Sequence, residues 1–336
     1  MSPAVMHLAS GKLPVILLRR LIRYTGARDP AVVIGPRFGE DAAVIDLGDR
    51  YLILKSDPVT FTAQDIGWYA IHVNANDIAV MGAQPRWFQT TLIAPPGTSD
   101  RTVRQILRDV HLAARTLGIA VTGGHTEISS AVTRPIVAGD MQGTVMRDRL
   151  VTSAGARPGD VLILTKWAAI EGTSILARER PQVARRVLGA NRQRVAARLH
   201  RRPGISVVAE ARAAARAGAT AMHDPTEGGI AASLFELASA SSCRLDVELD
   251  RIPIHPFTRD LCAHFGIAPL GLIASGSLLA TLPPSRVAPL QSRLAAARIP
   301  VTVIGAVQAG RGVRARCAGK RVPFTWSERD ELARVL

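Results

Sequence analysis

The order of apolar and polar positions along the chain predicts helices and strands in irregular alternation. In the first half, helices are predicted for residues 13–25, 66–81 and 99–117. Strands are predicted for residues 42–46, 51–55, 87–93, 119–122 and 135–145. Ser99 is placed to cap the third helix, and Gly82 and Gly118 are placed to end the second and third helices. This half is therefore a mixed α/β unit.

A second α/β unit is predicted after the glycine- and proline-containing segment 154–160. Its strands are predicted at 161–165, 245–249, 277–282 and 301–307. Its helices are predicted at 172–180, 183–200, 204–217, 228–240, 256–265 and 284–297. We therefore divide the chain into an N-terminal helical extension (1–34), an N-terminal domain (35–153) and a C-terminal domain (154–336), which agrees with the length of 336 residues.

The charge balance is strongly basic, with a net charge of +15. Such a balance favours polyanionic partners, including nucleic acids. Aromatic residues make up only 4% of the chain, and none is interleaved with the arginine-rich helices as a base-stacking surface requires. We therefore interpret the arginines as solvated helix faces and expect no nucleic-acid partner, which a salt-dependent gel shift would check.

The three cysteines, Cys243, Cys262 and Cys317, match no metal-binding or disulfide pattern. They indicate a reduced, intracellular protein. The apolar run 13–18 is too short for a signal peptide, and no segment is long enough to cross a membrane. The expected location is the cytoplasm.

The candidate functional residues are acidic residues that lie beside small or strand-forming residues. The common nucleotide-binding and hydrolase motifs are absent from the sequence. Carboxylates instead lie at strand ends, inside an apolar helix and in glycine-rich turns, at Asp41, Asp57, Asp77, Glu127 and Asp224. Hard oxygen ligands at such places suit Mg²⁺ bridged to substrate phosphates. For each residue taken alone, the capping of a helix or turn is the competing interpretation, and spacing alone does not assemble them into a site.

Five motifs together resemble a known superfamily. They are Gly39-Glu40-Asp41-Ala42-Ala43-Val44, Lys55-Ser56-Asp57, Asn76-Asp77-Ile78-Ala79-Val80-Met81-Gly82-Ala83, Gly123-Gly124-His125-Thr126-Glu127 and His223-Asp224-Pro225-Thr226-Glu227-Gly228-Gly229. In this order they resemble the superfamily of aminoimidazole ribonucleotide (AIR) synthetase, selenophosphate synthetase, thiamine-monophosphate kinase and HypE. The HypE-like group is the nearest branch.

The resemblance implies a two-domain AIR-synthase-like α/β fold, in which the N-terminal domains of a homodimer close a β-barrel. ATP is expected in a cleft between the domains. The implied magnesium ligands are Asp41, Asp57, Asp77 and Asp224. The implied nucleotide-binding residues are Lys55, Asn76, Gly123, Gly124, Thr126, Thr226 and Gly228. His125 and Glu127 are the catalytic candidates, although His125 could equally be a turn residue bonded to backbone.

The activity implied by the resemblance is ATP- and Mg²⁺-dependent phosphoryl transfer to an oxygen of a small amide, carbonyl or acid-like acceptor. A kinase like thiamine-monophosphate kinase and a non-catalytic nucleotide-binding subunit are the alternatives. HypE carries a reactive cysteine at the end of a tail, whereas this sequence ends in Arg329–Leu336 with Cys317 upstream. We therefore expect no cysteine of this chain to be an obligatory carbamoyl acceptor.

Overall fold

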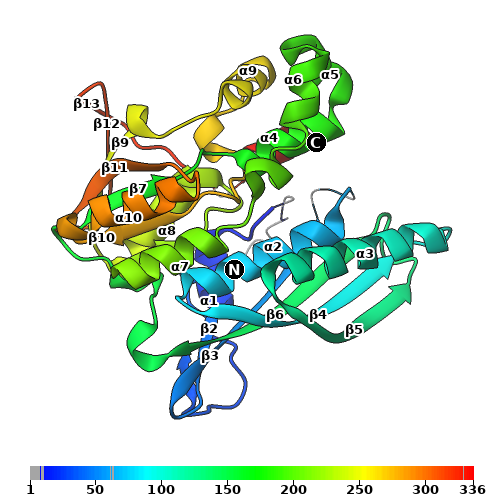
Figure 1. Cartoon of the computed structure of the whole chain (residues 1–336), viewed down its shortest axis with the longest axis horizontal. Coiled ribbons are helices and arrows are strands. Elements are labelled where there is room, and N and C mark those ends of the chain that lie inside the picture. Colours follow the sequence, from blue (N-terminus) through cyan, green and yellow to red (C-terminus); the bar gives the residue numbers. More distant parts are fainter. Residues whose placement is uncertain (1–7, 9–10, 61, 63, 328) are drawn as a thin grey trace, which may run out of the picture.

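A computed structural model describes residues 8, 11–60, 62, 64–327 and 329–336. It contains two α/β units, each built on one sheet (Figure 1). The strands of the first unit are β1 (Val32–Ile34), β2 (Ala43–Asp46), β3 (Arg50–Val59), β4 (Gln84–Ala94), β5 (Ala120–Ile128) and β6 (Ile136–Met146). Their order in the sheet is β1-β2-β3-β6-β4-β5, and only the β4–β5 pair is parallel.

Two helices, α2 (Ile66–Val80) and α3 (Asp100–Leu117), cover one face of this sheet. Apolar side chains from both helices and from the sheet share one core. The predicted helix ends are confirmed: the Ser99 side chain accepts a hydrogen bond from the Thr102 backbone N–H, and Gly118 follows α3 with φ 69°. The short α1 (Val15–Leu21) contributes no buried residue.

Helix α2 joins the two units. All but two of its fifteen residues are buried, which is typical of a helix that is apolar on every side and packed in a protein interior. Ile71 and Ile78 belong to the core of the first unit, whereas Ala79 and Val80 pack against the second. The polar residues Asn74, Asn76 and Asp77 are therefore buried and need partners: Asn74 faces the first sheet, whereas Asn76 reaches the second unit.

The second unit contains a seven-stranded sheet in the order β13-β12-β9-β11-β7-β10-β8. Its strands are β7 (Val161–Thr165), β8 (Ala221–His223), β9 (Arg244–Glu248), β10 (Leu279–Leu282), β11 (Val301–Gln308), β12 (Gly312–Cys317) and β13 (Lys320–Val322). Its helices are α4 (Ile170–Glu179), α5 (Pro181–Leu188), α6 (Ala190–Ala196), α7 (Val208–Ala217), α8 (Gly229–Ser241), α9 (Pro256–Phe265) and α10 (Pro284–Ala296).

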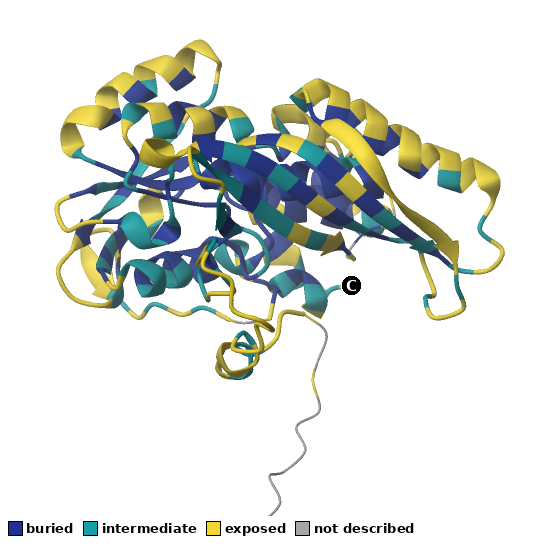
Figure 2. Cartoon of the chain, turned by 90° about the horizontal axis from the view of Figure 1, so that it is seen from below, coloured by how far each residue is buried: buried dark blue, intermediate teal, exposed yellow. Residues whose placement is uncertain are grey.

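Alternation along the central strand β7 shows how this sheet is covered. Leu162 and Leu164 pack in one core with α8, whereas Ile163 packs in another with α7 and α10. Helices therefore cover both faces of this sheet, while the first sheet is covered on one face only. Figure 2 shows the uncovered face of the first sheet, where half-buried and exposed residues alternate with buried ones.

Two predicted elements need correction. The segment 123–127 was expected to be a turn after a short strand, but it continues β5 to Ile128. The single helix expected over 183–200 is two helices, because Gly189 between them has φ 82°, outside the helical region. Strands β1, β8, β12 and β13 were not predicted; all except β12 have only three residues, too few to show a period. Within one chain the described strands form open sheets, so the barrel between two copies stays a prediction.

Candidate active site

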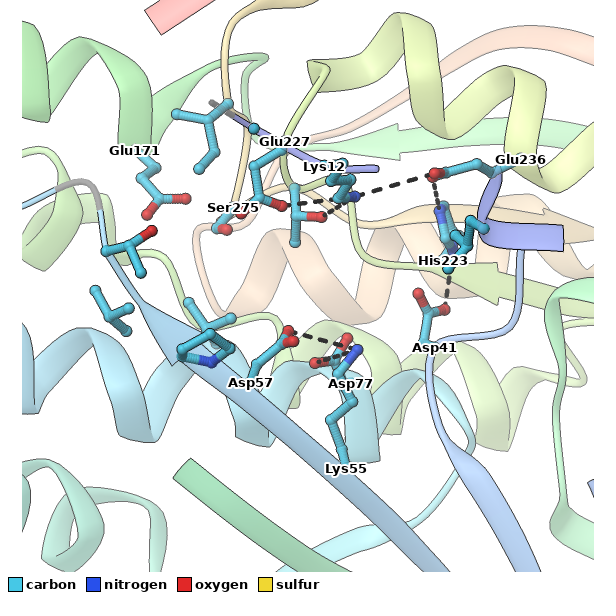
Figure 3. Close-up of a pocket in the computed structure, with 18 of the residues that line it drawn as sticks. Lys12, Asp41, Lys55, Asp57, Asp77, Glu171, His223, Glu227, Glu236 and Ser275 are labelled. Atoms are coloured by element: carbon cyan, nitrogen blue, oxygen red, sulfur yellow. Dashed lines mark hydrogen bonds and ion pairs between the residues drawn. The ribbon is translucent and has the colours of Figure 1, made fainter. Parts of the chain in front are cut away.

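A cavity of about 700 Å³ lies between the two units (Figure 3). Residues of β3, α2, α4 and α8 line it, together with loops from both units and part of the N-terminal segment. Seven carboxylates line this cavity against four lysines and arginines, although the whole chain is basic. The carboxylates are Glu40, Asp41, Asp57, Asp77, Glu171, Glu227 and Glu236.

Lys55 on β3 joins two of the predicted metal ligands. Its Nζ lies 3.4 Å from Asp57 Oδ2 and 3.4 Å from Asp77 Oδ2. Period-two alternation puts Lys55 and Asp57 on the same face of β3, toward α2, where Asp77 is buried. Burial alone would lower the pKa of Lys55, but the carboxylates of Asp77, Asp57 and Asp41 outweigh it and raise that pKa. Lys55 is therefore a fixed positive charge.

Asp41, His223 and Glu236 form a second polar network in the cavity. His223 Nδ1 lies 2.9 Å from Asp41 Oδ2, and His223 Nε2 lies 3.0 Å from Glu236 Oε2. Burial lowers the pKa of His223, yet the two carboxylates more than compensate and raise it well above its usual value. His223 is therefore an imidazolium that donates to both acids. The glycine at position 39 allows α8 to pack close to the loop that carries Asp41, because a Cβ there would lie 3.0 Å from the Glu236 carbonyl oxygen.

Asp224 is the most isolated of the predicted metal ligands. It is 1% exposed, and neither carboxylate oxygen has a hydrogen-bond partner among the described residues. Burial raises its pKa, and the charges of Asp77 and Asp41 raise it further. Burial and neighbouring carboxylates likewise raise the pKa of Asp77 against the opposing effect of Lys55. Lys55 offsets part of this repulsion at Asp77, whereas the unpartnered oxygens of Asp224 are unfavourable without a further cation.

These oxygens fit Mg²⁺ in part. Among the described residues, no three His, Cys, Asp or Glu side chains already converge as a metal cluster. Mg²⁺ commonly uses one or two protein carboxylates, with waters and substrate phosphates as its other ligands. The unpartnered oxygens of Asp224 and the carboxylate of Asp77, which has an ion pair with Lys55, match that donor set, so a metal would bind here together with a nucleotide rather than alone.

Two asparagines of α2 hold the site together. Asn74 was not predicted from the sequence; its side chain bonds the backbone N–H and carbonyl of Asp57 at 3.0 and 3.2 Å. Asn76 was predicted to bind nucleotide, but its amide bonds the carbonyl of Ile205 and the N–H of Val207. Its side chain therefore ties the first unit to the second. The signal for Asn74 was a polar residue one helical turn before Asp77 in an apolar helix.

The loop before α8 meets the N-terminal segment at the cavity. Thr226, a predicted nucleotide ligand, accepts a hydrogen bond from Lys12 Nζ at 3.1 Å. Lys12 also lies 3.5 Å from Glu227 and 4.0 Å from Glu236. Gly228 has φ 82° and gives its N–H to the carboxylate of Asp330 at 2.7 Å. Lys12 was not predicted to lie in this site, because its neighbours in the sequence form no motif.

The motif Gly123-Gly124-His125-Thr126-Glu127 lies elsewhere. All five residues are exposed on β5, the edge strand of the first sheet, and none lines the cavity. His125 Nε2 lies 3.4 Å from Glu127 Oε2 in an exposed pair. A Cβ at Gly124 would collide with the Thr90 carbonyl oxygen of β4, so strand pairing alone accounts for this glycine. Within one chain these residues do not join the aspartates.

Glu171 and Ser275 also line the cavity, and the sequence analysis missed both. Glu171 is in the first turn of α4 and Ser275 is in the loop before β10. Both side chains are buried, and hydrogen bonding to Ser275 opposes the effect of burial on the Glu171 carboxyl. Burial raises the pKa of Glu171 to about 7, and the charges of Glu227 and Asp330 add to this shift. An acid between an isoleucine and a glycine carries no sequence signal of its own.

Comparison with known proteins identifies the family. Residues 39–145 match the N-terminal domain of AIR synthase related proteins, and residues 157–318 match their C-terminal domain. The carbamoyl dehydratase HypE of Rhodobacter capsulatus is 31% identical over 267 residues, which cover 79% of this chain and 74% of that protein. The chain belongs to the AIR synthase-related family. The thiamine-monophosphate kinase of Pyrococcus abyssi is 26% identical over 283 residues, which cover 82% of this chain and 84% of that enzyme.

Solved structures show the same fold. The structure of a HypE–HypF complex aligns with a TM-score of 0.76 at 18% identity, covering 92% of this chain and 99% of the other. AaThiL complexed with AMPPCP and TMP aligns with a TM-score of 0.74 at 22% identity, covering 96% and 98%. These likenesses confirm the expected two-domain α/β architecture. In the part of the chain that the structure describes, no helix has both the length and the apolarity that a bilayer crossing needs.

Proposed function

We propose that this protein is an ATP- and Mg²⁺-dependent enzyme that transfers the γ-phosphoryl group to an oxygen of a small acceptor, as a HypE-like member of its family. The observation that carries the proposal is the group Asp57, Asp77 and Asp224. Lys55 lies between the half-buried Asp57 and the buried Asp77, and both oxygens of the buried Asp224 lack a hydrogen-bond partner among the described residues. One relative is named as a carbamoyl dehydratase, and a structural neighbour is complexed with an ATP analogue.

The charge of the cavity supports nucleotide binding with metal rather than without it. An acid-lined cavity repels a bare triphosphate, whereas a magnesium-bound triphosphate presents cations to the carboxylates. Lys55 and Lys12 would then meet phosphate oxygens, and Asp77 and Asp224 would hold the metal. In the transfer, a bond forms between the acceptor oxygen and the γ-phosphorus, and the bond to the β,γ-bridging oxygen breaks, releasing ADP. The chain's part is to position and neutralise these groups.

A kinase activity like that of thiamine-monophosphate kinase is the second candidate. The likeness to the Pyrococcus enzyme covers more than four fifths of both chains, so the overall match does not separate the two activities. A binding subunit without turnover is the third. Release of ADP that a small acceptor stimulates would favour either enzyme, and nucleotide binding without such stimulation would favour the binding subunit.

We also propose that the protein acts as a homodimer through the first sheet. That sheet has one uncovered face, on which Leu52, Leu54, Trp87 and Ile136 are only half-buried. Its edge strand β5 exposes Val121 and Ile128 at 45% and 52%. An apolar face and an unpaired edge of this kind favour pairing with a second copy. His125, Thr126 and Glu127 could then reach a nucleotide only in the cavity of the partner.

The metal–nucleotide site can be tested by thermal unfolding. Mg²⁺ with the analogue AMPPCP should stabilise the protein, by about 2.7 kcal/mol at a hundred times the dissociation constant. Asp77→Asn should abolish this stabilisation and leave the ligand-free protein at least as stable, because it removes a buried charge from a repelling group. The control Asp148→Asn, at an exposed site, should keep the full shift. A full shift in the Asp77 variant would refute the proposed site, as would a shift that needs no metal.

A further inference from the structure

The end of the chain packs behind the cavity rather than inside it. None of residues 329–336, which the structure describes throughout, lines the cavity. Leu332 is fully buried in a core shared by α4 and α9, and the Arg180 side chain donates a hydrogen bond to the Val335 carbonyl at 2.7 Å. Figure 1 shows this end of the chain beside α4. Just upstream, the Trp326 ring stacks on an aromatic ring of α8, so the C-terminal segment is held on both sides.

Asp330 begins this segment and is only 1% exposed. Its two carboxylate oxygens accept hydrogen bonds from the backbone N–H groups of Gly228 and Leu332, both at 2.7 Å. Burial raises the pKa of this carboxyl to about 6, against the opposing effect of hydrogen bonds from the backbone of Leu332, Gly228 and Ile273. One buried carboxylate therefore joins two distant loops, the loop before α8 through Gly228 and the loop before β10 through Ile273.

Both of these loops line the cavity. Thr226 and Glu227 belong to the first loop, and Ile273 and Ser275 belong to the second. The loops also contact each other directly, because a backbone N–H of the second donates to the Thr226 carbonyl at 3.3 Å. Figure 3 shows Glu227 and Ser275 next to each other at the cavity. Asp330 does not line the cavity, so its influence on a ligand has to pass through the two loops.

The backbone of the first loop makes this anchor important. Gly228 and Gly229 both have positive φ, 82° and 64°, and glycine enters and leaves such conformations readily. Their geometry therefore depends on the contacts around them. The carboxylate also lies at the N-terminal end of α8, where the helix dipole favours a negative charge. Because Asp330 already uses the Gly228 N–H, the side chains of this loop, rather than that N–H, are left to face a ligand.

We propose that Asp330 is a positioning residue for the magnesium–nucleotide site: it fixes the spacing of the two loops and so places Thr226 and Glu227 against the bound nucleotide. The proposal rests on the phosphoryl-transfer function above and adds to it a residue that lies outside the family motifs. Lys12 depends on the same loop, because its Nζ donates to Thr226 Oγ1 at 3.1 Å and lies 3.5 Å from Glu227. A shift of the loop therefore displaces this lysine as well.

Isothermal titration calorimetry of Mg²⁺–AMPPCP against the full chain tests the proposal. Asp330→Asn keeps the size of the side chain but only one acceptor oxygen for two backbone donors, so the Kd should rise by at least about tenfold. Hydrogen–deuterium exchange of residues 224–229 should become faster in the same variant, because the Gly228 N–H loses its acceptor. The matched control Glu331→Gln removes the neighbouring carboxylate, which pairs with Arg334, and should change neither measurement.

A second control separates positioning from general loss of stability. Leu290→Ala removes a buried side chain of α10, away from the cavity. It should lower the melting temperature at least as much as Asp330→Asn does, yet leave the Kd within about twofold of the wild-type value. If Asp330→Asn does not fold, Arg180→Met loosens the segment from its other end, by releasing the Val335 carbonyl, and should weaken binding several-fold.

The outcomes are distinct. A folded Asp330→Asn variant that binds Mg²⁺–AMPPCP with the wild-type Kd would show that the contact is only structural and would overturn the proposal. Equal weakening in Leu290→Ala or Glu331→Gln would overturn it as well, as would unchanged binding in Arg180→Met where that variant is the one measured. A wild-type chain that does not bind Mg²⁺–AMPPCP would overturn the proposed function, and the positioning role with it.

Discussion

Two motif regions of this chain, equally visible in the sequence, have opposite environments in the structure. The region around Lys55, Asp57 and Asp77 is brought together by β3 and α2 and is largely buried. The Gly123–Glu127 region lies extended along an outer edge and is exposed at every residue. A motif thus indicates that its residues share a function, but only the packing of the chain determines whether they contact one another within one chain.

The difference has a physical cause. Asp77 lies in a helix that is buried on every side and faces only the cavity, so its position is fixed by the burial of its neighbours. An edge strand has one free row of backbone groups, and its side chains need no partner in the same chain. Predictions that disturb charge should therefore have large effects in the first region and small ones in the second.

Removal of Lys55 should have the largest effect. Lys55→Met leaves Asp77 and Asp57 without their shared cation, and breaking a buried pair costs about 3 kcal/mol or more of the free energy of unfolding. Urea unfolding should show this loss, and the double variant Lys55→Met/Asp77→Asn should recover part of it. The control Lys320→Met, on the exposed β13, should stay within about 0.5 kcal/mol of the wild type. A loss equal in both lysine variants would mean that the ion pairs contribute nothing.

The pH dependence of stability should report the buried acid that lacks a cation. The pKa of Glu171 is raised from 4.5 to about 7, so the folded chain holds a proton that the unfolded chain releases between these values. Stability should fall as pH rises through that window, by about 3 kcal/mol from this residue. Glu171→Gln removes the contribution, so its stability relative to the wild type should increase from about pH 4.5 to about pH 7 and then level. If the free energies of unfolding of the two proteins change in parallel with pH, Glu171 is solvated and the prediction is wrong.

The parts of the molecule that could be predicted from the sequence are those with a regular hydrophobic period or a recognisable family motif. The long amphipathic α3 and its caps are confirmed, and so are the family and the two-domain fold. Motif order alone named Asp77 and Lys55, which the structure places 3.4 Å apart. It did not find Lys12, Glu171 or Ser275, because each enters the cavity from a separate loop or helix end and has no pattern around it. Nor could it show that Asn76 bonds backbone rather than nucleotide.

The smallest effect on the single chain, and the sharpest test of the comparison, should come from β5. His125→Ala and Glu127→Gln break an exposed pair that lies 66% and 54% in solvent, so the free energy of unfolding should change by less than about 0.5 kcal/mol. Any loss of Mg²⁺–AMPPCP stabilisation in these variants would then have to come through a second copy.

Ile128→Lys places a charge on the same edge and should convert dimers to folded monomers in light scattering, whereas Val195→Lys, equally exposed on α6, should not. If Ile128→Lys remains dimeric, β5 is no interface. If it is monomeric and still binds the nucleotide with wild-type stabilisation, the Gly123–Glu127 region takes no part in the site, and its glycines serve strand pairing alone.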